Sequence, residues 1–193
     1  MSSSIVNEND FKSHKISVYE PFSNFLLGTE EEKRFDLTLL DVIQFAGHAC
    51  PSMVGAFLIS QRVIKELFPT GVCVRGDVEI DIPSAATQGA TGPISNVFGF
   101  IFGAWAETGF GGLNGQFVRR GLVRYSVSDL PPGVFRFRNI KTGACVDAFY
   151  NPGLAPFEAQ EQESFQLQWR RKIKSILEHP DAVLKIQVVS KGR

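Results

Sequence analysis

The sequence has little of what several large functional classes need. Its 193 residues include only three cysteines and three histidines. The cysteines, Cys50, Cys73 and Cys145, are widely spaced and odd in number, and the chain contains no CxxC pair. This excludes a disulfide framework, a zinc ribbon and a dithiol redox motif, and it predicts a reducing, cytoplasmic setting.

The chain also lacks an excess of charge and a long apolar run. Lysine and arginine together number 20, as do aspartate and glutamate, so no overall field attracts nucleic acid or anionic lipid. The most apolar run, residues 97–106, is about half as long as a membrane-spanning helix needs to be, and the N-terminus has no apolar signal region. We therefore expect neither a nucleic-acid nor a membrane partner.

The order of predicted elements indicates the fold class. We expect a polar tail over residues 1–10 and a single domain over residues 11–193, a length that suits one core. The predicted helices cover residues 38–46, 50–68, 94–107 and 157–178, and the predicted strands cover residues 72–82, 116–127, 133–140, 144–150 and 182–190. Because helices and strands do not alternate strictly, the prediction is an α+β fold with an antiparallel or mixed sheet packed against helices.

The segment "FAGHACPSMVGAF", residues 45–57, places a histidine and a cysteine between two predicted helices. Gly47 suits the left-handed residue that ends the first helix, and Pro51 suits the first position of the second. Cys50 would then be the N-cap, where the positive end of the helix dipole favours a thiolate. His48 is close enough in sequence to share a ligand with it.

A thiolate and an imidazole are the donors that zinc or a related divalent transition metal prefers. Two donors do not complete a site. The predicted strand over 72–82 turns Cys73, Asp77, Glu79 and Asp81 to its polar face. Of its three carboxylates we expect Glu79 and Asp81 as further ligands. An equally simple interpretation is structural, with a buried Cys50 and a His48 that caps a neighbouring carbonyl.

Two glycine-rich loops, residues 83–93 and 108–115, offer a different kind of site. The first precedes a helix and could form an anion nest, but it lacks the lysine of a P-loop. The second evokes a dinucleotide motif but is predicted to run into a strand, whereas the phosphate-binding motif opens a helix. Both loops therefore favour simple turns, with a grip on a small ligand as the alternative.

The pattern F-x-G-H-x-C-P at residues 45–51, followed by a small-residue-rich apolar helix containing Gly55, resembles the core of the FmdE family. This family is named for one component of formylmethanofuran dehydrogenase, a molybdenum or tungsten enzyme of methanogenic metabolism. The resemblance extends over about two thirds of the chain. It implies an α+β core, a homodimer and a metal-binding role for His48 and Cys50.

The chain departs from the family pattern in two places. Typical members carry further cysteines after the first strand, and many end in a cysteine-rich zinc module; this chain has neither. We therefore expect an FmdE-like protein with one His/Cys metal site, whose remaining ligands are Glu79, Asp81, water, a small molecule or the partner subunit. The alternative is a non-metal accessory subunit or a module that binds an anionic or pterin-like ligand. Whether the protein is an enzyme stays open.

Overall fold

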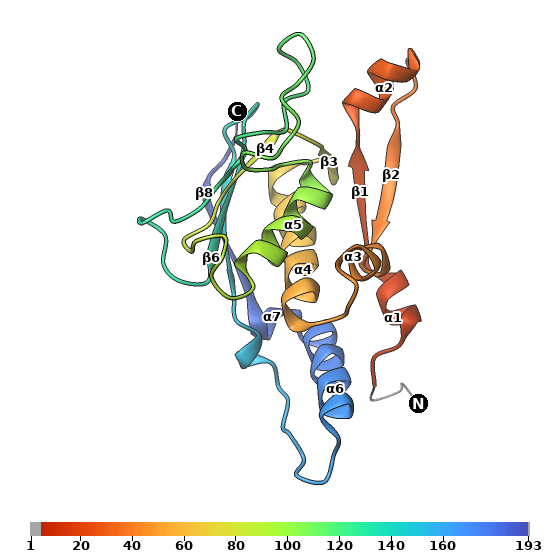
Figure 1. The fold of residues 1–193 in the computed structure, drawn as a ribbon, viewed down its shortest axis with the longest axis vertical. Coiled ribbons are helices and arrows are strands. Elements are labelled where there is room, and N and C mark those ends of the chain that lie inside the picture. Colours follow the sequence, from red (N-terminus) through yellow and green to blue (C-terminus); the bar gives the residue numbers. More distant parts are fainter. Residues whose placement is uncertain (1–4, 193) are drawn as a thin grey trace.

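The two central helices lie between two β-sheets in the computed structural model, which describes residues 5–192 (Figure 1). The three-stranded sheet has the order β2-β1-β3, and the five-stranded sheet has the order β5-β4-β6-β7-β8. Both sheets are mixed, because β1 pairs parallel with β3 and β4 pairs parallel with β5, while their other neighbours are antiparallel. This arrangement confirms the α+β class.

The strands and helices have the following bounds. The strands are β1 Lys15–Tyr19, β2 Arg34–Thr38, β3 Val72–Val74, β4 Val78–Asp81, β5 Val123–Arg124, β6 Val134–Asn139, β7 Cys145–Tyr150 and β8 Leu184–Ser190. The helices are α1 Glu8–Ser13, α2 Pro21–Leu27, α3 Leu39–Ala46, α4 Pro51–Leu67, α5 Thr91–Phe102, α6 Phe165–Glu178 and α7 Pro180–Val183, with a short 3-10 turn at Pro152–Leu154.

Helix α4 is the centre of the molecule. It packs against α3, α5 and α6 and against the five-stranded sheet, and most of its 17 residues are buried. A helix that is apolar on nearly all sides belongs in the core. The prediction for residues 50–68 is confirmed, and so is the helix before it: Thr38 and Asp41 form a capping box at the start of α3, and Gly47 ends α3 at φ 77°.

Aromatic side chains fill the space between α5 and the five-stranded sheet. Phe98 meets Phe135 and Phe137 edge to face, with ring centroids 5.4 and 5.1 Å apart, and Phe102 also packs on Phe137. Such contacts add to the stabilisation from burial alone. The helix begins at Thr91, earlier than the predicted residue 94, and ends before Gly103 at φ 63°.

The prediction of one continuous strand over residues 72–82 was wrong. Gly76 has φ +90° and breaks the run into β3 and β4, which belong to different sheets. The Arg119 side chain packs so closely on Gly76 that an added Cβ would meet it at 1.9 Å. The break also changes the phase of the alternation, because Cys73, assigned to the polar face, is fully buried.

Two other predicted elements are shorter than expected. Only Val123–Arg124 form a strand within residues 116–127, because Phe117, Gly121 and Ser126 adopt positive φ. Helix α6 begins at Phe165, with Ser164 as its N-cap, so residues 157–164 of the predicted helix precede it. The predicted strands over residues 133–140, 144–150 and 182–190 are confirmed as β6, β7 and β8.

The N-terminal elements are those that the sequence pattern does not predict. Residues 1–4 of the expected polar tail lie outside the described residues, but Val6 is buried and Asn7 caps α1. Strands β1 and β2 and helix α2 follow, each of five to seven residues. Elements this short carry too few apolar positions for a clear period. Within residues 5–192, no helix combines the length and apolar character needed to span a membrane.

Candidate metal site at the turn between α3 and α4

The turn from α3 to α4 presents His48 and Cys50 at the start of the central helix. Gly47 reverses the chain in the left-handed conformation, and Cys50 is extended, with φ −142° and ψ 163°. Pro51 is the first residue of α4, and Cys50 is its N-cap, as predicted. The Cys50 side chain forms no capping hydrogen bond and is half-buried. Its sulfur is therefore available beside the unpaired amide groups of the first helical turn.

The His48 ring has a defined orientation. Its Nδ1 lies 3.0 Å from the carbonyl oxygen of Ala46, and the side chain is exposed. A carbonyl oxygen only accepts hydrogen bonds, so Nδ1 carries the hydrogen, and in the neutral ring Nε2 keeps a free lone pair. Metal-ligating histidines have this arrangement. The contact equally fits the structural interpretation, in which His48 caps a neighbouring carbonyl.

Two side chains from distant parts of the sequence fix the backbone on either side of Cys50. Trp169 of α6 donates its indole N–H to the carbonyl oxygen of Ala49 at 3.1 Å. Tyr150, at the end of β7, donates its hydroxyl to the carbonyl oxygen of Pro51 at 2.6 Å. Burial raises the pKa of Tyr150, and the nearby Cys50 raises it further. Tyr150 therefore remains a neutral donor at the base of the helix.

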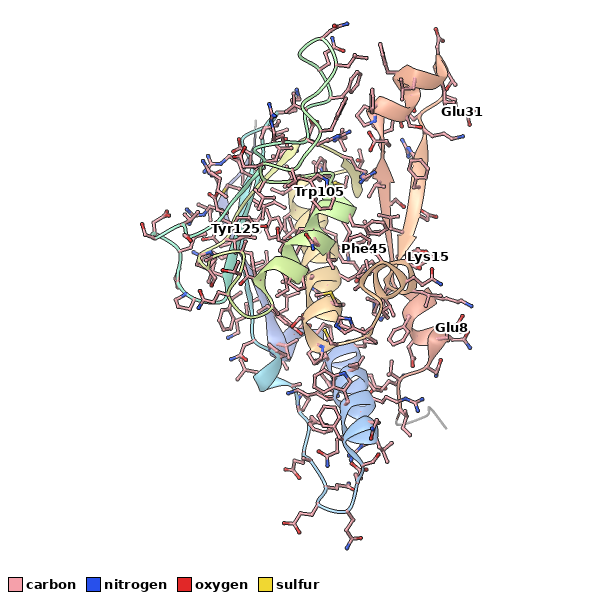
Figure 2. All side chains as sticks on the ribbon, in the orientation of Figure 1. Glu8, Lys15, Glu31, Phe45, Trp105 and Tyr125 are labelled. Carbon is pink, nitrogen blue, oxygen red and sulfur yellow. The ribbon has the colours of Figure 1, made fainter. Side chains whose placement is uncertain are left out.

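Two cavities reach residues on either side of Cys50 in the chain. One cavity of about 390 Å³ reaches Ala49 and is bordered by α1, α3 and α6. Another, of about 220 Å³, reaches Ser52 and Tyr150. Phe45, labelled in Figure 2, is half exposed and stacks on Phe100 of α5 at a centroid distance of 5.0 Å. The two cavities thus reach residues close to Cys50 in the chain, although the lining of neither includes His48 or Cys50.

Glu79 and Asp81 do not join His48 and Cys50. Their neighbours in β4, Val78 and Ile80, are fully buried in the core that contains α4, so the alternation of the strand turns both carboxylates to the other face of the sheet. There Asp81 accepts two hydrogen bonds from Arg124, at 2.6 and 2.8 Å. The hydrogen bond to Asp81 is the main reason that the pKa of Arg124 is raised, and Glu79 adds to it.

Across the described part of the chain, no three His, Cys, Asp or Glu side chains gather where they could hold one metal ion. The structure therefore provides two of the four predicted donors at the turn and assigns Asp81 to an ion pair. No local pattern indicates this pairing, because Arg124 follows Asp81 by 43 positions. The parallel pairing of β4 with β5 brings them together.

The two glycine-rich loops line different cavities. Residues 83, 84, 90 and 91 border the cavity of about 220 Å³ at the start of α5, whose lining includes no charged side chain. Gly115, at the end of the second loop, borders a separate cavity of about 470 Å³. The two loops therefore do not line the same cavity, and neither of these two cavities would let both loops contact one ligand.

Sequence reasoning missed Tyr150 and Trp169 as neighbours of the turn. Tyr150 carries only the signal of a strand residue, and Trp169 that of an apolar helix position. Gly55 is the sequence feature that reflects the position of Tyr150, because a Cβ at residue 55 would lie 2.2 Å from Cζ of Tyr150. A glycine inside a long apolar helix can thus indicate the close approach of another side chain.

Comparison with known proteins does not assign the chain to a group. No protein-family model matches the sequence, and no curated protein matches it. The resemblance to the FmdE family, carried by residues 45–51 and the helix after them, stays a prediction.

Proposed function

We propose that this protein binds a divalent transition metal such as zinc through Nε2 of His48 and the sulfur of Cys50, in the manner that the FmdE-like motif implies. The observation that carries the proposal is the contact between Nδ1 of His48 and the carbonyl oxygen of Ala46 at 3.0 Å. It leaves Nε2 as the free nitrogen of the neutral ring. The uncapped sulfur of Cys50 follows two residues later.

A site with two protein donors needs ligands from elsewhere, since zinc is almost always four-coordinate in structural sites. Water, a small molecule from the adjoining cavities or the same residues of a second copy can supply them. The proposal therefore includes a homodimer. Phe165, which is 69% exposed and packs on Trp169, offers apolar surface to a second copy near the turn.

The ligand set decides the chemistry. An exchangeable position on the metal would support metal-assisted hydrolysis or the polarisation of a carbonyl group. A set closed by a second copy would give a structural or carrier role. In either case the half-buried thiol of Cys50 must stay reduced, so the proposal places the protein in the cytoplasm.

Cobalt substitution tests the proposal. Titration of Co²⁺ into metal-free protein should produce a sulfur-to-cobalt charge-transfer band in the near ultraviolet, because cobalt is bound by a thiolate. Cys50→Ser should abolish this band, and His48→Ala should weaken binding. His179→Ala is the matched control, since this histidine is exposed and lies at the far end of α6.

The outcomes separate clearly. A band that is retained in Cys50→Ser, or that never forms in the wild type, overturns the proposal. Light scattering of the same samples with and without metal tests the dimer: an increase in mass on metal addition that His48→Ala removes would show that a second copy completes the site.

A further inference from the structure

The cavity that Gly115 borders lies at the opposite end of α4 from Cys50. It has a volume of about 470 Å³, within the range of small-molecule sites. Its walls come from the turn between β3 and β4, the loop before β5, the start of α2 and the turn after β6. These segments meet at the upper end of the molecule in Figure 1. The 17 residues of α4 separate it from the His48–Cys50 turn by about 25 Å.

Two guanidinium groups meet on one carboxylate beside this cavity. Oε2 of Glu20 accepts a hydrogen bond from Nη1 of Arg75 at 2.9 Å, and Oε1 accepts one from Nη2 of Arg119 at 2.5 Å. Arg75 also donates Nη2 to the carbonyl oxygen of Phe100 at 3.0 Å. A single carboxylate thus faces two permanent cations, and it can neutralise only one of them.

Arg119 keeps unused donors. Its side chain is only 9% exposed, and its guanidinium lies against the Cα atoms of Gly76 and Gly103. Within residues 5–192 only Glu20 accepts a hydrogen bond from the Arg119 side chain, and Nε of Arg75 is buried without an acceptor. Because buried polar groups are rarely left unpaired, this end of the cavity lacks an acceptor. Arg119 lines the cavity, so its remaining exposure opens into it.

The charges around the cavity favour an anion. Burial lowers the pKa of Arg119, and Arg75 adds to this effect while Glu20 opposes it. Lys141 contributes a third cation at the exposed rim. The acidic groups are Glu20 and Asp77, and burial raises the pKa of Asp77. Three cations therefore face two carboxylates, which leaves one positive charge in excess.

The remaining walls are apolar. Phe117, Val118 and Ile140 line the cavity, and Val118 and Ile140 are each about 40% exposed. Phe117 is held in a left-handed conformation, φ 57°, with its ring 5.1 Å from that of Phe22. An apolar wall beside a cluster of cations suits a ligand that has both an anionic group and an apolar part.

We propose that this cavity binds a small organic anion, whose carboxylate or phosphate group is held by Arg119 and Lys141 and whose apolar part lies against Phe117, Val118 and Ile140. The site is independent of the metal site, because the two share no residue. Each proposal can therefore fail without the other.

Calorimetry with model anions tests the site. The probes are benzoate and phenyl phosphate, with benzamide as their neutral counterpart, at low ionic strength, where charge pairs are least screened. We expect one site per chain for at least one anion and none for benzamide. Lys141→Met should weaken binding by about tenfold, and Arg119→Met should abolish it. Lys185→Met is the matched control, since Lys185 is exposed and lies on β8.

Each result decides the question. Binding of phenyl phosphate alone identifies phosphate as the recognised group, and binding of benzoate alone identifies a carboxylate. Absence of heat with both anions up to about 10 mM, or equal binding of benzamide, overturns the proposal. Should Arg119→Met fail to fold, Lys141→Met decides: unchanged affinity in this folded variant also overturns it.

Discussion

The contact between Gly55 and Tyr150 allows a sharp test of how the base of α4 is built. In Gly55→Ala the new Cβ would lie 2.2 Å from Cζ and 2.7 Å from the hydroxyl oxygen of Tyr150. Carbon atoms in contact lie about 3.5–4.0 Å apart, so the ring must move away from the helix by roughly 1.5 Å. This movement breaks the buried hydrogen bond from Tyr150 to the carbonyl oxygen of Pro51.

The magnitude follows from three contributions. Overpacking costs about 1–3 kcal/mol, and leaving the buried Tyr150 hydroxyl unpaired costs about 1–3 kcal/mol. Replacing glycine by alanine inside a helix returns about 1 kcal/mol. We therefore expect Gly55→Ala to lower the free energy of unfolding by about 1–5 kcal/mol. Urea denaturation followed by circular dichroism measures this value.

A double-mutant cycle separates the contact from helix propensity. In a Tyr150→Ala background the obstacle is gone, so Gly55→Ala should now stabilise the protein, by up to about 1 kcal/mol. If the single variant Gly55→Ala is neutral or more stable than the wild type, the close packing of Tyr150 on α4 is refuted.

Two further predictions follow from burial and charge. A thiol reagent should label Cys50 rapidly in the native protein and Cys73 and Cys145 only after unfolding, because burial raises the pKa of both; counting labelled thiols by mass spectrometry checks this, and rapid native labelling of more than one thiol contradicts it. Burial alone would raise the pKa of Asp10, but its hydrogen bonds with Lys174 and Asn7 hold that pKa below its usual value. The stabilisation from this pair is then complete above about pH 4 and is lost as the pH falls further. The difference between the urea midpoints of the wild type and Asp10→Asn should thus be largest near pH 6 and shrink as the pH is lowered towards about 3, and a constant difference would contradict the role of Asp10.

The elements that the sequence predicts well are those whose signals are local. The capping box of Thr38 and Asp41, the left-handed Gly47 and the proline at the start of α4 all act within one turn of the chain. The same local signals place Cys50 correctly as an N-cap. Strands β6 to β8 alternate clearly enough to be recognised by period alone.

The features that the sequence does not reveal depend on distant partners. In the sequence, Gly76 is a single glycine within an alternating run and does not indicate a break. Only the packing of Arg119 on Gly76 explains the break between β3 and β4. Likewise, Asp81 has the residue type of a metal ligand, and only the pairing of β4 with β5 shows that Arg124 occupies it. The position of His48 and Cys50 at the turn was predictable; the separation of Glu79 and Asp81 from this turn was not.

The metal content of protein purified without a metal-affinity tag tests the central claim most directly. Elemental analysis should find a near-stoichiometric divalent transition metal in the wild type and little in His48→Ala and Cys50→Ser. Glu79→Gln and Asp81→Asn serve as matched controls and should retain the wild-type content, because both carboxylates lie on the other face of the sheet. Equal metal in all five proteins, or metal in none, would contradict the account.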